Sequence, residues 1–168
     1  MMCFAMVWSV LWLCPPNADA EGPRIVDVHV DKEYRTALLA NESLMQEGGV
    51  DTVRVHDGID VLVGVGQVML EADATPAEAL SARRAAETKA TRVVSEFLRT
   101  DISTVSTLVR SVVKHSEGVE GTSKRIEKYL GTHVQQRSQL AARIKRVGYW
   151  SSADGRCVFV AVAVVPIK

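Results

Sequence analysis

The longest periodic pattern in the chain lies between Thr75 and Arg99, where apolar residues recur with the period of an α-helix. Thr75 is a suitable N-cap, Pro76 suits the first helical position, and Glu78 completes a capping box. One narrow face of this helix is mostly alanine. Its residues are Ala79, Ala82, Ala86, Ala90, Val93 and Phe97, and Leu80, Val94 and Leu98 lie beside it. The pattern therefore predicts a single long helix with a shallow buried face.

The apolar run of residues 59–70, directly before this helix, predicts a strand that is buried on both faces. Two glycines share one face of the strand, where they would let the alanine face of the helix come close. The expected close-packing residues are Gly64, Gly66, Ala82, Ala86 and Ala90. A dinucleotide-binding motif is not indicated, because Met69 occupies the third glycine position and the helix begins too late.

The chain upstream predicts three further elements. Residues 25–30 alternate as a short strand, and Asp31 then caps a helix that runs to the glycine pair at 48–49. Residues 52–70 have the pattern of a β-hairpin whose turn is Asp57-Gly58. The long apolar strand forms the second half of this hairpin.

The chain downstream is less uniform. Residues 101–115 favour a strand because valines alternate with Ser and Thr, although the same residues also suit the helical period. Residues 117–122 contain two glycines and indicate a loop, and residues 123–142 predict a second long helix. Residues 143–150 and 156–165 predict a hairpin whose last strand is apolar on both faces and therefore central.

This order of elements predicts an α+β fold with two to three helices packed on a largely antiparallel sheet. We expect a signal peptide at 1–20, an N-terminal strand and helix extension at 21–50, and an α+β domain at 51–168. A domain of about 150 residues buries roughly 68–70% of its unfolded surface, which is enough for a conventional core.

The leader has the features of a secretory signal peptide. An apolar run from Phe4 to Leu13 is too short to span a bilayer, Pro15-Pro16 ends it, and Ala18-Asp19-Ala20 fits the small-x-small cleavage pattern. Lipidation of Cys14 is the alternative, but bulky residues precede this cysteine where lipid-attachment sites have small ones. Cleavage after Ala20 leaves one cysteine, Cys157, which we expect to be a small core residue.

Charge and motifs narrow the function. The chain has 20 basic and 20 acidic residues, so nothing global indicates a nucleic-acid partner. The sequence lacks a nucleophile-elbow motif and histidines with metal-site spacing; Asp27, His29 and Asp31 alternate on one strand but make a weak ligand set. We therefore expect no enzyme, no metal and no cofactor.

One segment is locally basic. Residues 123–146 contain a single acidic residue, Glu127, among seven basic ones: Lys124, Arg125, Lys128, Arg137, Arg143, Lys145 and Arg146. A solvated helix and strand edge explains this bias. The functional alternative is a surface for an anionic partner, such as lipid headgroups, cell-wall polymer or an acidic protein.

Three segments together resemble the Lpp-twenty-like family of exported envelope proteins. They are the glycine strand VLVGVGQVML (61–70) with the alanine helix after it, the basic segment LAARIKRVGYW (140–150), and the last strand DGRCVFVAVAVVP (154–166). The family includes the flagellar assembly protein P group, and the amino-terminal domain of flagellar assembly protein T has a similar strand and helix. Its typical member is a lipoprotein, and the residues before Cys14 depart from that pattern.

The resemblance implies a non-enzymatic structural or assembly protein of the periplasm or outer membrane, associated with flagellar components and forming homo-oligomers. Its partners would be other envelope proteins. The alternative expectation is a periplasmic binding module that uses residues 123–146 for an anionic ligand at a membrane surface or cell wall.

Overall fold

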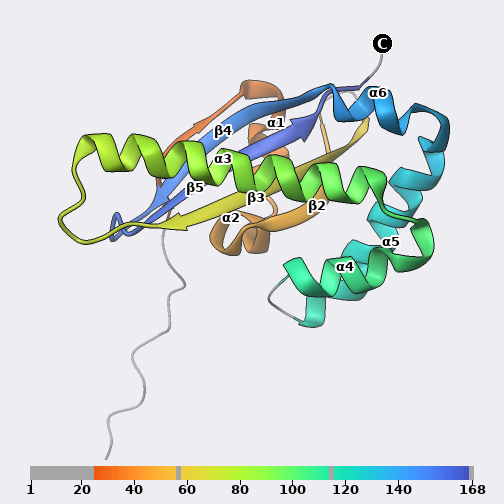
Figure 1. The fold of residues 1–168 in the computed structure, drawn as a ribbon, viewed down its shortest axis with the longest axis horizontal. Helices are drawn as coiled ribbons and strands as arrows, with labels where there is room; N and C mark the ends of the chain where they lie inside the picture. The colour runs from red at the N-terminus through yellow and green to blue at the C-terminus, as the bar shows by residue number, and fades with distance from the viewer. Residues whose placement is uncertain (1–24, 56–57, 114–115, 167–168) are drawn as a thin grey trace, which may run out of the picture.

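The computed structural model describes residues 25–55, 58–113 and 116–166. Within them, five strands form one antiparallel sheet in the order β1-β4-β5-β3-β2 (Figure 1). The strands are β1 (Ile25–Val30), β2 (Gly49–Arg54), β3 (Asp60–Met69), β4 (Ile144–Ser152) and β5 (Cys157–Val164). The two apolar runs β3 and β5 are neighbours near the middle of the sheet, which confirms that both are central.

Six α-helices accompany the sheet in this part of the chain: α1 (Lys32–Leu39), α2 (Glu42–Glu47), α3 (Pro76–Arg99), α4 (Val105–Val112), α5 (Ser116–Thr132) and α6 (Arg137–Ala141). Two short 3-10 helices, η1 (Ile102–Thr104) and η2 (Val134–Gln136), join them. The predicted α+β class is confirmed, but the expected number of two to three helices was too small.

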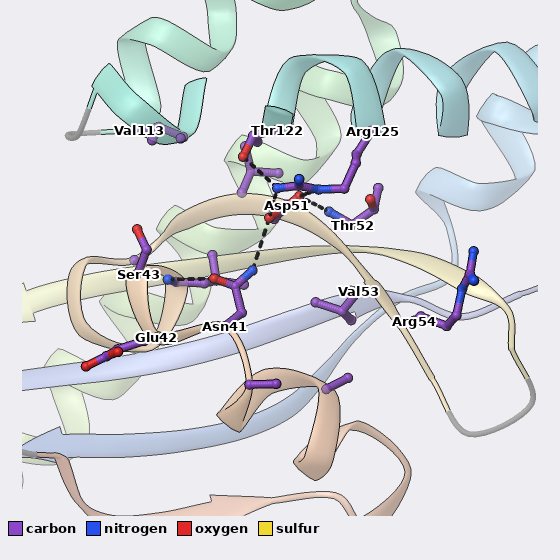
Figure 2. Close-up of a pocket in the computed structure, with 16 residues that line it drawn as sticks. Asn41, Glu42, Ser43, Asp51, Thr52, Val53, Arg54, Val113, Thr122 and Arg125 are labelled. Atoms are coloured by element: carbon purple, nitrogen blue, oxygen red, sulfur yellow. Dashed lines mark hydrogen bonds and ion pairs between the residues drawn. The ribbon is translucent and has the colours of Figure 1, made fainter. Parts of the chain in front are cut away.

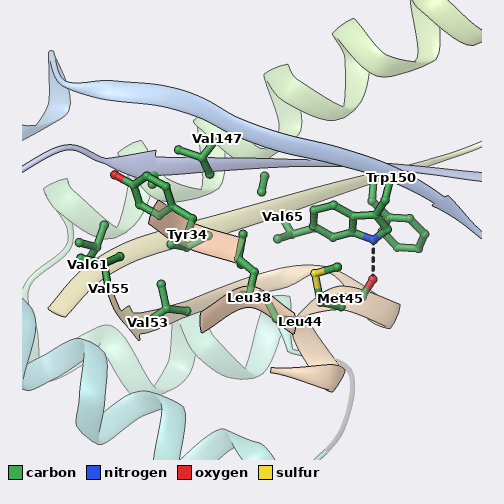
Figure 3. Close-up of a cluster of buried hydrophobic side chains, with 14 residues drawn as sticks. Tyr34, Leu38, Leu44, Met45, Val53, Val55, Val61, Val65, Val147 and Trp150 are labelled. Atoms are coloured by element: carbon green, nitrogen blue, oxygen red, sulfur yellow. Dashed lines mark hydrogen bonds between the residues drawn. The ribbon is translucent and has the colours of Figure 1, made fainter. Parts of the chain in front are cut away.

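The sheet is covered on both faces (Figure 1). On one face, α1 and α2 contribute Tyr34, Leu38, Leu44 and Met45 to a core that also contains Trp150 (Figure 3). On the other face, α3 lies across β3 and β5, and helices α4, α5 and α6 extend this layer beyond its end. Residues 25–47 therefore belong to the same sheet and core as the segments that follow them.

Helix α3 begins as its sequence predicts. The Thr75 Oγ1 accepts a hydrogen bond from the Glu78 N–H, and the Glu78 carboxylate accepts one from the Thr75 N–H at 2.7 Å, which completes the capping box. The alanines at 82, 86 and 90 are 6%, 0% and 1% exposed. Leu80, expected beside this face, is 51% exposed because it lies past the border of the buried stripe.

Strand β3 and helix α3 touch along their backbones. A Cβ atom on Gly66 would lie 2.0 Å from the Ala86 carbonyl oxygen, and one on Gly64 would lie 3.1 Å from the Ala90 carbonyl oxygen. No side chain fits between them at these positions, so the two elements pack more closely than any residue other than glycine would allow here.

Two predictions in the middle of the chain were wrong. Residues 101–115, expected as a strand, contain η1 and α4. Val105 and Val109 are both fully buried and lie four residues apart, so the helical period and not the alternation governs this segment. Residues 117–122, expected as a loop, lie inside α5, where Gly118 and Gly121 cost some helix stability without ending the helix.

Two expected long helices are divided. The helix predicted from Asp31 to the glycine pair breaks at Asn41, whose side chain accepts a hydrogen bond from the Leu44 N–H at 3.1 Å and so caps α2. The helix predicted over 123–142 ends at Thr132 and continues as η2 and α6. The Asp57 half of the expected hairpin turn lies outside the described residues.

None of the helices within the described residues combines the length and the apolar character needed to cross a lipid bilayer.

Candidate functional site

A cleft of about 520 Å³ lies beside β2, at one edge of the sheet (Figure 2). The start of α2 forms one side of the cleft, and the end of α4 and the first turns of α5 form the other. Its polar lining residues are Asn41, Glu42, Ser43, Asp51, Thr52, Arg54, Thr122 and Arg125. Its volume is within the range of small-molecule and cofactor sites.

Asp51 is the central residue of this cleft and is only 6% exposed. Its carboxylate accepts two hydrogen bonds from Arg125, at 2.9 Å from Nε and 2.6 Å from Nη2. It also accepts one from Asn41 Nδ2 at 3.0 Å and one from the Thr52 N–H at 2.7 Å. Four donors from three parts of the chain therefore hold the only carboxylate that is buried among the described residues.

The local structure explains why these groups meet. Asn41 caps α2, which fixes its side chain at the start of that helix. Thr122 and Arg125 are three residues apart on α5 and face the same way, and Thr122 Oγ1 accepts a hydrogen bond from Arg125 Nη2 at 3.0 Å. We call Asn41, Asp51, Thr122 and Arg125 the clasp.

The clasp holds its charges in place. The hydrogen bond and the charge of Asp51 raise the pKa of Arg125, so the guanidinium stays protonated at any pH at which the protein is folded. Both carboxylate oxygens of Asp51 already accept two donors each, which leaves little capacity for a substrate proton. The arrangement is that of a structural ion pair, and removal of one partner would leave a buried unpaired group.

Five of the seven predicted anionic-partner residues have hydrogen-bond or ion-pair partners within the chain. In addition to the Arg125–Asp51 pair, two of these residues form ion pairs. Lys124 Nζ lies 2.7 Å from Glu120 Oε1, and Arg146 Nη1 lies 3.3 Å from Glu87 Oε2. Arg137 donates to the carbonyl oxygens of Thr100 and Leu130, and Arg143 donates to those of Val165 and Pro166. Lys128 and Lys145 are exposed.

The weak metal set on β1 is not assembled as a site. The His29 ring stacks on Tyr149 with 4.8 Å between ring centroids. Within the described residues, no group of three or more His, Cys, Asp or Glu side chains is placed to hold a metal ion.

Cys157 lies at the start of β5 and is half-buried, so it is less enclosed than the core position that the sequence suggests. Its Sγ is 3.1 Å from Met69 Sδ and accepts a hydrogen bond from Gln67 Nε2 at 3.2 Å. Both contacts join the neighbouring strands β3 and β5.

The clasp was missed at the level of sequence, because 74 residues separate Asp51 from Arg125. One signal in the sequence does point to it. Asp51 shares an alternating strand face with Val53 and Val55, which are both buried, and aspartate is disfavoured there unless a partner compensates its charge.

Comparison with known proteins gives no match: no family model, no curated protein and no solved structure is significantly similar to this chain.

Proposed function

We propose that this protein is an exported, non-enzymatic structural or assembly protein of the bacterial cell envelope that associates with itself. The observation that carries the proposal is the use of charge in the fold. Asp51 and Arg125 of the cleft bind each other, Arg54 binds Asp60, and most of the basic segment binds carbonyl oxygens and carboxylates of the same chain. Charged groups that bind other groups of the same chain stabilise the fold, as expected of a structural protein.

The sequence supports the compartment and the family. Residues 1–20 have the pattern of a cleavable leader, and the segments 61–70, 140–150 and 154–166 resemble the Lpp-twenty-like envelope family. We further propose a role beside flagellar outer-membrane components, and this more specific role depends on the resemblance.

Helix faces are better suited than sheet edges to carry the association. At the β1 edge, the register shifts between Val26 and His29 and Asp27 has a φ of 52°, so the strand is irregular where a partner strand would pair. At the β2 edge, Arg125 binds across the strand to Asp51. The outer side of α3 is a long exposed surface without such obstacles (Figure 1).

Cell fractionation combined with sequencing of the mature amino terminus tests the export part of the proposal. We expect the protein in the periplasmic or outer-membrane fraction, with Glu21 as its first residue. An acylated Cys14 would retain the envelope role and add a lipid anchor. A cytoplasmic protein that begins at Met1 would contradict the proposal.

The second candidate, a binding module for an anionic envelope ligand, has weaker support because five of the seven basic residues bind groups of the same chain, which leaves the exposed Lys128 and Lys145. Replacement of these two lysines with glutamine should lower retention on anionic vesicles or cell-wall material if that candidate is right, and unchanged retention would remove it.

A further inference from the structure

Arginine side chains differ in their partners in the part of the chain that the structure describes. One group binds carboxylates or carbonyl oxygens of the same chain, and its members are Arg54, Arg125, Arg137, Arg143 and Arg146. Arg84, Arg92 and Arg99 are exposed on α3, and no described residue forms a hydrogen bond or an ion pair with their guanidinium groups. These three cations are therefore available to a partner outside the chain.

The three arginines lie in a line along the outer side of α3, and we call them the arginine line. At 3.6 residues per turn they fall within about 80° of one another, on the side opposite the buried alanines, and at 1.5 Å per residue they span about 22 Å. A hollow of about 530 Å³ is lined by Arg84 and Arg92, and a second of about 320 Å³ is lined by Arg92 and Arg99. Thr88 and Ser95 lie between the arginines, and these short side chains leave the guanidinium groups unshielded.

The carboxylates of α3 compensate little of this charge. The helix has three acidic residues, of which Glu78 accepts hydrogen bonds in the capping box and Glu87 pairs with Arg146 at 3.3 Å. Glu96, which lines the second hollow, is the third. Since the whole chain has 20 basic and 20 acidic residues, the excess of positive charge on the outer side of α3 is a local feature and not a consequence of the overall charge.

We propose that the arginine line binds the phosphate groups of an anionic membrane surface. A guanidinium group is planar and always charged, and it can donate two parallel hydrogen bonds to the oxygens of one phosphate. The inference rests on the proposed envelope role, because that role places the protein beside a membrane. It does not depend on self-association or on the basic residues of the segment 123–146.

A flat anionic surface is the occupant that the position of α3 favours. Figure 1 shows α3 along its whole length with no other element in front of it, so one plane can contact all three arginines. The same side of α3 in a second copy fits poorly, because it would bring two lines of positive charge face to face. Association through α3 therefore requires a different surface of the second copy.

The contact with the membrane is mainly electrostatic. Leu80 is the one large apolar side chain of α3 that is exposed, so the helix lies on the headgroups and does not enter the hydrocarbon. Each arginine close to an anionic leaflet strengthens binding by about fivefold, so three arginines contribute about a hundredfold. At about 0.1 M salt the screening length is about 10 Å, so charges on other sides of the protein contribute little.

Sedimentation with phospholipid vesicles tests the proposal. The chain is purified without residues 1–20, which lie outside the described fold, and is mixed at about 0.1 M salt with vesicles of phosphatidylglycerol or of uncharged phosphatidylcholine. The test variant is Arg84→Gln/Arg92→Gln/Arg99→Gln, in which glutamine keeps a high helix propensity at each exposed position.

The matched control removes the same number of positive charges from other elements. It is Arg35→Gln/Arg110→Gln/Arg156→Gln, whose three arginines are exposed on α1, on α4 and before β5. Thermal unfolding followed by circular dichroism verifies that both variants keep the parent fold.

We expect the parent and the control to bind the phosphatidylglycerol vesicles, and the test variant to bind them about a hundredfold more weakly. Failure of the parent to bind these vesicles would overturn the proposal, as would an equal loss in both variants or equal binding to phosphatidylcholine. Two results would assign the arginine line to another occupant and also overturn it. One is binding of inorganic polyphosphate without binding of vesicles, and the other is a loss of self-association in the test variant without binding of vesicles by the parent. Cell fractionation is a separate measurement, so a failure of the envelope role is distinguished from a failure of this inference.

Discussion

The contact between β3 and α3 makes Gly66→Ala the most informative single substitution. A methyl group there would lie 2.0 Å from the Ala86 carbonyl oxygen and 2.9 Å from both the Ala86 carbonyl carbon and the Ala90 nitrogen. All three atoms belong to the helix backbone, so no side-chain rotation relieves the overlap. The helix must move away from the strand by about 1 Å before the distance exceeds 3.0 Å, below which real Cβ atoms essentially never lie.

A movement of this size affects the whole interface. A gap of 0.5–1 Å forfeits roughly a quarter to a half of the dispersion energy at each contact. Overpacking of a well-filled core commonly costs about 1–3 kcal/mol, and rigid backbone places this site at the upper end, so we expect a loss of about 3 kcal/mol or more. For a domain of this size, that corresponds to a fall of roughly 10 °C in Tm.

Denaturant titration followed by circular dichroism and tryptophan fluorescence measures this loss. Trp150 is fully buried and is the only tryptophan beyond the expected leader, so its emission reports the core directly. The matched control is Gly118→Ala, because a Cβ atom there has no neighbour within 4 Å and the residue lies in α5. Alanine should leave stability unchanged or raise it by up to about 1 kcal/mol.

A free energy of unfolding for Gly66→Ala within 1 kcal/mol of the parent would refute the close-packing account. A large loss in Gly118→Ala would also weaken it, since the effect would then follow from any added methyl group.

Three smaller predictions concern other parts of the fold. Burial raises the pKa of Tyr129 to about 12, so the stabilising contribution of its neutral form is complete below pH 10 and is lost as the pH rises from 10 to 12. At most about 3 kcal/mol of this pH dependence should disappear in Tyr129→Phe, measured by unfolding at both pH values. Thr75→Ala removes the N-cap of α3 and should cost about 1 kcal/mol in the same assay, whereas no loss would mean that the capping box contributes nothing. Trp150→Phe leaves the buried Met45 carbonyl oxygen without its 2.8 Å donor (Figure 3) and should cost about 1–3 kcal/mol by circular dichroism; a stability equal to the parent would show that this bond is dispensable.

The parts of the fold that the sequence predicts well are those with strong, long patterns. Helix α3 has a capping box and many turns of consistent period, and β3 and β5 are apolar runs bounded by turn residues. Gly64 and Gly66 could be matched to the alanine face because both features are local and lie in consecutive elements. Here the sequence predicted each element and the contact between them.

The remaining parts depend on contacts that a local pattern does not contain. In α4, valines and hydroxyl residues suit both a strand and a helix, and burial of Val105 and Val109 together favours the helix. In α5, the tertiary contacts outweigh two glycines that indicate a loop. The clasp lies outside the reach of local reasoning, since Asp51 and Arg125 meet only after β2 and α5 have packed at the same edge.

The central claim is that this chain associates with itself as an assembly protein. Light scattering coupled to size-exclusion chromatography, run over a hundredfold range of protein concentration, tests this claim most directly. We expect a mass of two or more protomers at the higher concentrations. A mass of one protomer at every concentration would contradict it.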